Sequence, residues 1–261
     1  MLHRPLHLRH LLVLLIALAS PLVVFAGETF EQIRQRGEIR VGLEGTYPPF
    51  SFQDERGQLS GFEVEFSQAL AKELGVRAAL QPTKWDGILA ALESGRLDVV
   101  INQVTITEER RRKYDFSEPY TVSGIQALVR KGQEGFARPA DLAGKRVGVG
   151  LGTNYEQWLR ENVPDAVVRT YDDDPTKYQD LRVGRIDTIL VDRRAAFELM
   201  RQTGGALVLS GEPFARQEAG VAMRKGDPEL LQAINAAIET LRADGTLADL
   251  SRKWFDADVT E

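Results

Sequence analysis

The sequence predicts an α/β protein of two lobes, each a mostly parallel sheet flanked by helices. Apolar runs of strand length alternate with helical patterns in both halves of the chain, which is typical of parallel sheets. A pattern of Gly-Arg, an apolar residue, Asp and an apolar strand occurs at Gly95–Ile101 and again, 89 residues later, at Gly184–Leu190. The repeat indicates that both lobes share one architecture and present the same edge of their sheets.

The first 26 residues have the pattern of a secretory signal peptide. Two arginines precede an apolar run at residues 11–25, and residues 24–26 have the small-residue pattern of a cleavage site. The run is short for a membrane span and contains Pro21, and no cysteine follows it that could carry a lipid anchor. We expect the mature chain to begin at Gly27.

The composition of the mature chain excludes several function classes. All three histidines lie in the first 26 residues and the sequence has no cysteine, so Ser-His-Asp and Cys-His catalysis, disulfides and His/Cys zinc sites are excluded. We expect no metal and no cofactor. Without Arg4 and Arg9, 31 of the 33 basic residues remain against 38 acidic residues, a net charge near −7. Nucleic acid is therefore not an expected partner.

Hydrophobic periodicity and the positions of glycine and proline set the order of the elements. In the first half we expect strands at residues 38–43, 78–81 and 97–101, and helices at residues 62–74, 88–93 and from 108. In the second half we expect strands at residues 126–129, 145–150, 167–171, 186–190 and 218–224, and helices at residues 155–161, from 174, and in two parts between 228 and 255. Gly75, Gly95 and Gly245 end helical patterns, as glycine commonly does.

The most informative stretch is residues 99–112, where a buried strand ends in Asn102-Gln103. Thr107 has the pattern of an N-cap for a short helix, and Arg110 stands just behind the polar turn. In an open α/β sheet, ligands bind beyond the carboxyl ends of strands, and arginine is a two-pronged donor for a carboxylate. The alternative is that Thr105 and Thr107 only cap the helix and that the basic run is a solvated face.

Two aromatic residues stand in turns rather than in strands. Pro48 and Pro49 stiffen the loop that presents Tyr47, which either packs in the core or offers a platform to a ligand. Trp85 lies at a strand-to-helix turn and either closes a hydrophobic staple or faces a ligand.

Two polar turns follow expected strands in the second half. The turn at Gly152-Thr153-Asn154 precedes a helix whose free amides could seat an anion, although most glycine turns merely connect and no GxxxxGK[ST] phosphate loop is present. The run Asp172-Asp173-Asp174-Pro175 is interpreted as an N-cap with proline at the first helical position, because the spacing of a calcium-binding EF-hand is absent.

Taken together, these segments resemble the periplasmic solute-binding proteins for polar amino acids. The shared motifs are G-x-x-x-x-YPPF, GFEVEF, KWDGILAAL, TITEERR followed by DFSEPY, VGVGLGTNYEQWL and GRIDTILVD. The longer runs at residues 101–121, 147–162 and 169–193 are similar to the branch of the family that binds L-cystine. The resemblance spans essentially the whole mature chain.

The resemblance implies the type II periplasmic binding protein fold, with the ligand cleft between the lobes. One lobe would comprise residues 27–120 and 221–261, and the other residues 121–220, with hinge crossings near residues 119–124 and 216–221. It also implies a periplasmic monomer that delivers its ligand to the permease of an inner-membrane ABC transporter.

Carried over by motif position, the resemblance implies that Arg110 grips the α-carboxylate of the ligand. The Thr105 hydroxyl and amides near Thr153 and Asn154 would assist it. Asp192 would take the α-ammonium. The residue chemistry agrees, because an α-amino acid is a fixed pair of opposite charges, and a ligand that touches both lobes favours the closed clamp.

A main-chain carbonyl at Asn102 or Gln103 would join Asp192 on the ammonium. Tyr47 and Trp85 would line the cleft and sandwich the aliphatic part of the ligand.

Cystine carries a second ammonium and a second carboxylate. By resemblance, Glu44 is the expected partner of the distal ammonium, with Asn102, Gln103 and Lys84 as candidates for the distal carboxylate.

Three alternatives stay open. The ligand could be another polar amino acid such as arginine, glutamine or diaminopimelate. The chain could be a cyclohexadienyl dehydratase on the same scaffold, for which Glu44 or Asp192 would have to donate a proton. It could also be a sensory module, although the chain ends at Glu261 without a membrane span or kinase segment.

Overall fold

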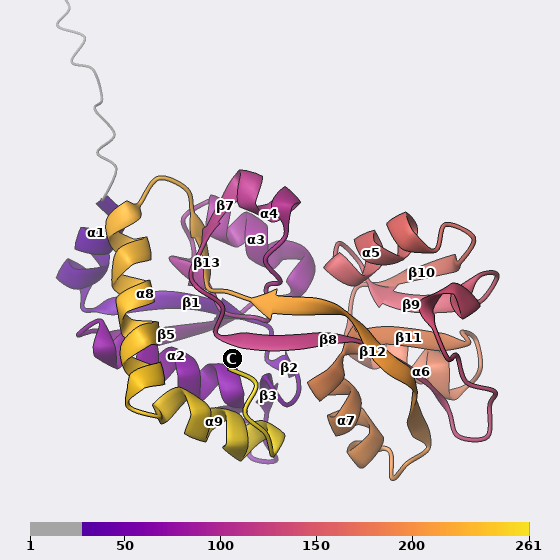
Figure 1. Ribbon diagram of the computed structural model, residues 1–261. Helices are drawn as coiled ribbons and strands as arrows, with labels where there is room; N and C mark the ends of the chain where they lie inside the picture. Colours follow the sequence, from indigo (N-terminus) through magenta and orange to yellow (C-terminus); the bar gives the residue numbers. More distant parts are fainter. Residues whose placement is uncertain (1–27, 261) are drawn as a thin grey trace, which may run out of the picture.

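Two five-stranded sheets organise the structure, one in each lobe (Figure 1). The computed structural model describes residues 28–260, and the expected signal peptide at residues 1–26 lies outside the described residues. The first sheet contains, in spatial order, β5 (Arg77–Pro82), β1 (Glu38–Leu43), β6 (Val99–Val100), β13 (Ala222–Arg224) and β7 (Tyr114–Phe116). The second contains β10 (Val167–Tyr171), β9 (Arg146–Gly150), β11 (Thr188–Asp192), β8 (Thr121–Arg130) and β12 (Leu207–Ala219).

Both sheets have the same topology. In the first, β5, β1 and β6 are parallel, and β13 runs antiparallel between β6 and β7. In the second, β10, β9 and β11 are parallel, and β8 runs antiparallel between β11 and β12. Four of the five strands in each sheet therefore point the same way, which confirms the two mostly parallel sheets predicted from the sequence.

The helices divide between the two sheets. With the first are α1 (Glu28–Arg36), α2 (Phe62–Glu73), α3 (Trp85–Glu93), α4 (Glu108–Lys113), α8 (Pro228–Ala243) and α9 (Thr246–Phe255), together with a small sheet of β2 (Thr46–Tyr47), β3 (Ser51–Gln53) and β4 (Leu59–Ser60). With the second are a 3₁₀ turn (Pro139–Leu142), α5 (Asn154–Asn162), α6 (Asp174–Arg182) and α7 (Arg193–Gln202). Within residues 28–260, none of these helices combines the length and apolarity that a membrane crossing requires.

The structure departs from the expected elements at several places, and strands β2, β3, β4 and β7 and residues 207–217 of β12 are not among those expected. The run at residues 218–224, expected as one strand, is divided between the two sheets, because β12 ends at Ala219 and β13 begins at Ala222. Gly220 lies between them, where a Cβ atom would come within 3.1 Å of the Ser117 carbonyl oxygen. Helix α1 was not predicted, because Ile33 is its one fully buried apolar side chain and gives no periodic pattern.

The repeat marks the same contact in both lobes. Asp98 precedes β6 and accepts hydrogen bonds from the Arg40 amide at 2.8 Å and from the Arg40 guanidinium at 2.6 Å. Asp187 precedes β11 and accepts the same two bonds from Arg146, at 2.8 and 2.7 Å. Each aspartate thereby fixes the start of the neighbouring parallel strand, β1 in the first lobe and β9 in the second, which confirms that the lobes share one architecture.

Strands β8 and β12 connect the two lobes (Figure 1). They pair antiparallel as far as Thr121, which lies opposite Ala219. At that end the Tyr120 amide donates to the Ala219 carbonyl at 2.9 Å, and the Val122 amide donates to the Val259 carbonyl at 2.7 Å. The C-terminal tail therefore braces the crossing from the first lobe.

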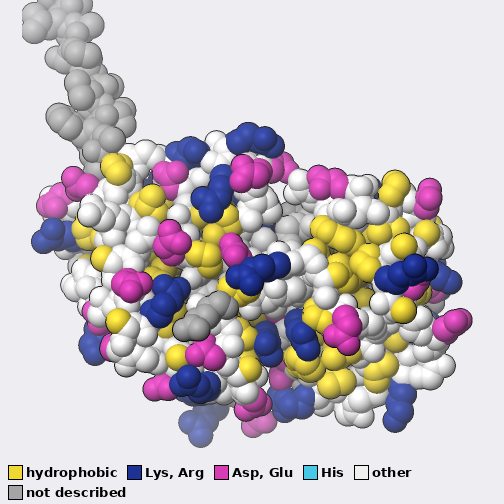
Figure 2. Space-filling view, viewed as in Figure 1, with side chains coloured by type: hydrophobic (Ala, Val, Ile, Leu, Met, Phe, Trp, Pro, Cys, Tyr) yellow, Lys and Arg dark blue, Asp and Glu magenta, His cyan; other side chains and the backbone are white. Residues whose placement is uncertain are grey.

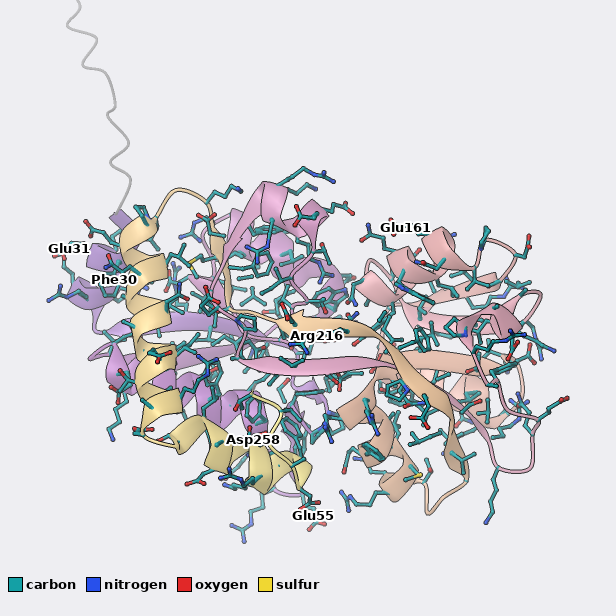
Figure 3. The ribbon with its side chains drawn as sticks, viewed as in Figure 1. Phe30, Glu31, Glu55, Glu161, Arg216 and Asp258 are labelled. Carbon is teal, nitrogen blue, oxygen red and sulfur yellow. The ribbon has the colours of Figure 1, made fainter. Side chains whose placement is uncertain are left out.

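Charges of both signs are interspersed on the face that Figure 2 shows, and apolar side chains gather there over the lobe of the second sheet. Arg216, labelled in Figure 3, lies on β12 where that strand passes between the lobes. It pairs with Glu218 at 3.1 Å, and both side chains are largely exposed.

We expect Asp98→Ala to lower the free energy of unfolding by about 3 kcal/mol, because it leaves two arginines without their buried partner. The Asp98 side chain is 1% exposed and also pairs with Arg36 at 2.5 Å. Asp187→Ala is the matched variant and should lose less, because the Asp187 side chain is 23% exposed. Urea denaturation of both variants measures the difference. Equal losses of unfolding free energy would contradict the expectation that the more buried aspartate contributes more to stability.

Candidate ligand-binding site

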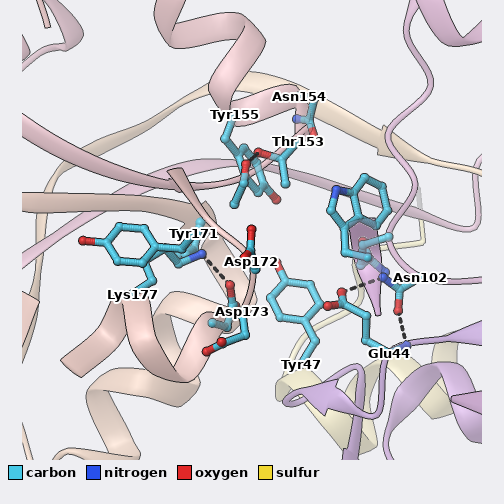
Figure 4. Close-up of a pocket in the computed structure, with 15 residues that line it drawn as sticks. Glu44, Tyr47, Asn102, Thr153, Asn154, Tyr155, Tyr171, Asp172, Asp173 and Lys177 are labelled. Atoms are coloured by element: carbon cyan, nitrogen blue, oxygen red, sulfur yellow. Dashed lines mark hydrogen bonds and ion pairs between the residues drawn. The ribbon is translucent and has the colours of Figure 1, made fainter. Parts of the chain in front are cut away.

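A pocket with a cavity volume of about 50 Å³ lies between the lobes, beyond the carboxyl ends of their parallel strands (Figure 4). Glu44 follows β1 and Asn102 follows β6 in the first lobe, while Thr153 follows β9 and Asp172 follows β10 in the second. Open α/β proteins bind small molecules at this edge, because loop amides and helix N-termini converge there. The pocket is therefore the candidate ligand site.

The structure brings most of the predicted site residues into this pocket. Those that line it are Glu44, Tyr47, Trp85, Asn102, Gln103, Thr153 and Asn154. Arg110, Asp192 and Thr105 lie outside the lining, as does Lys84. The lining residues that were not predicted are Gly150, Tyr155, Tyr171, Asp172, Asp173, Asp174, Lys177 and Val191.

Glu44 and Asn102 hold each other in place on the wall of the first lobe. The Asn102 side-chain amide donates to Glu44 Oε2 at 2.8 Å, and the Glu44 backbone amide donates to Asn102 Oδ1 at 2.8 Å (Figure 4). Burial raises the pKa of Glu44 to about 7, although the hydrogen bond from Asn102 opposes that rise. The pocket therefore contains a carboxyl group that titrates near neutral pH.

Glu63, which the sequence analysis did not single out, positions the turn at Gln103. Its Oε1 accepts hydrogen bonds from the Gln103 amide at 2.6 Å and from the Tyr120 hydroxyl at 2.7 Å. Gln103 has a φ of 47°, a left-handed conformation that a residue with a side chain rarely adopts. The Thr121 hydroxyl donates to Gln103 Oε1 at 3.0 Å. The buried carboxylate therefore connects the pocket to the start of β8.

Arg110 lies behind Trp85. Its Cζ is 5.2 Å from the centroid of the Trp85 ring, and its Nη1 donates to the Thr105 carbonyl at 3.0 Å. Burial lowers the pKa of Arg110 to about 10. Together with Thr153 and Asn154, Arg110 also borders a neighbouring crevice. The structure thus brings the predicted carboxylate donors together, although Arg110 and Thr105 stand beside the pocket rather than on its wall.

Gln217 on β12 joins donors from both lobes. Its Oε1 accepts a hydrogen bond from the Thr105 hydroxyl at 3.1 Å and another from the side-chain amide of Asn154. One acceptor oxygen therefore lies where side-chain donors of the two lobes converge. The sequence analysis did not identify Gln217, because it lies inside a strand and belongs to none of the motifs.

Asp192 has a structural role in the second lobe. It is the N-cap of α7, where its Oδ1 accepts from the Arg194 amide at 2.6 Å. Asp192 is 2% exposed, and burial raises the pKa of its carboxyl. Burial is the main cause of the raised pKa of Tyr47 and of Tyr155. Neighbouring negative charges, including that of Asp192, add to the rise. The charge of Asp192 is therefore felt by two tyrosines that line the pocket.

The turn before α5 already has partners for some of its amides. Glu156 Oε2 accepts from the Gly152 amide at 2.8 Å, and the Thr153 hydroxyl accepts from the Glu156 amide at 3.3 Å. The anion seat expected at this helix N-terminus is thus partly filled by the chain itself. Thr153 and Asn154 still face the pocket.

The aspartate run after β10 was predicted only as a helix cap. Asp173 is the N-cap of α6 and accepts from the Thr176 amide at 2.8 Å, which confirms the cap, although the helix begins at Asp174 and Pro175 is its second residue rather than its first. The same run also lines the pocket. The signal that could have found it is its place directly after a parallel strand. Within residues 28–260, no group of three or more His, Cys, Asp or Glu side chains is arranged to hold a metal ion.

Comparisons with known proteins agree with this architecture. The family described as bacterial extracellular solute-binding proteins, family 3, matches residues 39–257. The chain is 64% identical over 253 residues to the L-cystine-binding protein TcyJ of Escherichia coli K12, covering 95% of each chain.

Solved structures give the same picture. An ancestral arginine-binding protein bound to arginine matches with a TM-score of 0.81 at 41% identity, over 84% of this chain and 99% of that one. An ancestral amino acid-binding protein described as a precursor of cyclohexadienyl dehydratase matches with a TM-score of 0.81 at 40% identity, over 87% and 99%.

We expect Glu63 to make stability depend on pH. Burial raises its pKa from 4.5 to about 7, so the folded chain binds more protons than the unfolded chain between these values. Stability relative to Glu63→Gln should therefore fall by about 3 kcal/mol as the pH rises through this window, and then level off.

Urea denaturation at pH 5 and pH 8 measures this difference between the two chains. The exposed Glu73→Gln, on the same helix, controls for the loss of one carboxylate. Parallel pH profiles for the wild type and Glu63→Gln would rule out the proposed burial effect.

Proposed function

The chain belongs to the bacterial extracellular solute-binding proteins of family 3, and on that premise we propose that it captures L-cystine in the periplasm for import by an ABC transporter. The observation that carries the proposal is the convergence of donors from both lobes on Gln217 Oε1. A carboxylate oxygen has the same acceptor chemistry as this amide oxygen and adds a charge. The ligand's α-carboxylate would replace Gln217 there and recruit Arg110.

The α-ammonium would be held on the opposite side of the pocket. We propose that Asp192, which is buried, supplies the negative charge, and that a main-chain carbonyl at Asn102 or Gln103 completes the partners of the ammonium. Tyr47 and Trp85 line the pocket and would sandwich the aliphatic part of the ligand. Each of these groups suits a compact zwitterion, which needs one cation, one anion and neutral dipoles.

Ligand binding would close the clamp. We propose that residues 27–120 with 221–261 form one lobe and residues 121–220 the other, with hinges near residues 119–124 and 216–221. The pairing of Thr121 with Ala219 supports hinges at these positions, since β8 and β12 connect the lobes there. Because Arg110 and Asp192 come from different lobes, a ligand that touches both stabilises the closed state over the open one.

The proposed partners follow from this role. A secreted carrier meets the permease of an inner-membrane ABC transporter, and a monomer leaves the clamp free to open. A net charge near −7 after signal-peptide removal does not favour nucleic acid. No catalysis is needed for capture and delivery.

One observation favours a second candidate. Glu44 has a pKa of about 7 within the pocket, which suits a proton donor at neutral pH. A dehydratase acting on cyclohexadienyl substrates would need such a group. A binding role explains Glu44 equally well, because its hydrogen bond from Asn102 holds the carboxyl group in place for a ligand ammonium.

We expect L-cystine to raise the unfolding midpoint of the mature protein, refolded to remove bound ligand, more than arginine, glutamine or diaminopimelate does. At about a hundred times the dissociation constant a ligand adds roughly 2.7 kcal/mol, which corresponds to about 5 to 11 °C for a chain of this size. Arg110→Ala and Asp192→Asn should each weaken binding by about 2 to 5 kcal/mol, because one charge is left unpaired in a desolvated cleft.

The neighbouring Arg111→Ala, at an exposed position, is the matched control and should bind normally. A larger midpoint shift with another amino acid would support the carrier function but would identify that amino acid, rather than L-cystine, as the ligand. No shift with any amino acid, together with turnover of prephenate or arogenate, would support the dehydratase instead.

A further inference from the structure

A buried lysine stands on the pocket wall of the second lobe. Lys177, in the first turns of α6, is 2% exposed and lines the pocket. Its Nζ pairs with Asp174 Oδ1 at 2.5 Å, which Figure 4 draws as a dashed line at Lys177. Asp174 Oδ2 also accepts a hydrogen bond from the Tyr178 hydroxyl. None of these three residues has a ligand role implied by the sequence motifs.

The charges of this pair reach the opposite wall. Burial is the main cause of the raised pKa of Glu44, but the charge of Asp174 adds to that rise and the charge of Lys177 reduces it. Glu44 belongs to the first lobe and the pair belongs to the second. Glu44, Asp174 and Lys177 all line the same pocket, so a carboxyl group of one lobe and an ion pair of the other border one space.

A purely structural role does not account for this arrangement. An ion pair three residues apart on a helix contributes little when exposed, and a buried one is seldom more stable than apolar packing of the same volume. Lys177 is among the most buried charged side chains of residues 28–260, and it lines the pocket between the lobes. A role in binding a charged group of the ligand explains the buried ion pair better than a role in stability does.

We propose that Glu44, Asp174 and Lys177 form a second head-group subsite, in which Lys177 holds a carboxylate and the two acids hold an ammonium at the far end of the ligand. This proposal rests on the function proposed above and specifies its ligand class. The ligand would be a bis-α-amino acid, with one head at Arg110 and Asp192 and the other at this subsite.

The subsite would select through the alternation of its charges. A bound distal head places its ammonium between Glu44 and Asp174 and its carboxylate against Lys177, so every charge has neighbours of opposite sign. The guanidinium of arginine would meet the two acids but would lie beside the Lys177 ammonium, and glutamine offers no charge to any of the three. The subsite would therefore reject arginine through charge repulsion and glutamine because its own charges would be left unpaired.

The experiment uses three ligands that differ only at the distal head. L-Cystine has both distal charges, the mixed disulfide of cysteine with cysteamine has only the ammonium, and the mixed disulfide with 3-mercaptopropionic acid has only the carboxylate. Isothermal titration of the mature protein, refolded to remove bound ligand, measures each affinity. The chain has no cysteine that could exchange with these disulfides.

Lys177→Met should weaken L-cystine and the mercaptopropionate disulfide about 10- to 100-fold and should not weaken the cysteamine disulfide. Glu44→Gln should do the reverse, weakening L-cystine and the cysteamine disulfide only. The double variant Asp174→Asn/Lys177→Met removes both charges of the pair and so separates the loss of the lysine from the effect of an unpaired Asp174. Thermal unfolding without ligand shows whether each variant is folded.

Three results would overturn the subsite. Equal losses for all three ligands in Lys177→Met would make Lys177 a structural residue, and unchanged L-cystine affinity in that variant would place the distal head elsewhere. In both cases wild-type binding of L-cystine leaves the carrier function standing. Failure of the wild type to bind any of the three ligands, while binding another amino acid, would overturn the cystine assignment and the subsite together.

Discussion

The antiparallel pairing of β8 with β12 is the contact on which the site depends. These strands belong to the second sheet, yet their ends at Thr121 and Ala219 bond to the first lobe through the backbone and through the C-terminal tail. The carboxyl edges of two similar sheets therefore face each other across a narrow space. Gln217, on one of these strands, receives a donor from each lobe, so the connection contributes to the site as well as carrying it.

The charged groups at this edge do not explain the stability of the fold. Glu63 and Asp192 are almost fully buried and Glu44 is half-buried, and burial raises the pKa of all three carboxyls, which means that their ionised forms are disfavoured in the folded chain. Stability comes from elsewhere, including the stacked rings of Phe66 and Tyr120, 4.7 Å apart, and Asp98 and Asp187, which hold the starts of β1 and β9. An incoming cation would therefore stabilise the ionised forms of these carboxyls, which burial alone disfavours.

The two lobes repeat a frame but not a site. At the repeat spacing of 89 residues, Gln103 at the end of β6 corresponds to Asp192 at the end of β11. The first lobe adds Arg110 after its strand, whereas the second places three aspartates and Lys177 after β10. An α-amino acid has a positive and a negative end, and walls of identical chemistry could not match both. The two lobes share one backbone topology but carry different side chains at their strand ends. This difference puts Arg110 on one side of the cleft and the three aspartates on the other.

Sequence patterns by themselves determined the two α/β lobes, the repeat and most of the polar residues at the strand ends, because periodicity and the position after a parallel strand are local properties of the chain. They did not reveal the division at Gly220, since only packing against Ser117 shows that the chain must change sheets there. They also missed Glu63, Lys177 and Gln217. Each of these lies inside an element that looks ordinary by its own pattern. Its role comes from a partner 40 or more residues away or on the opposite wall, and only the tertiary structure decides which distant groups share one desolvated space.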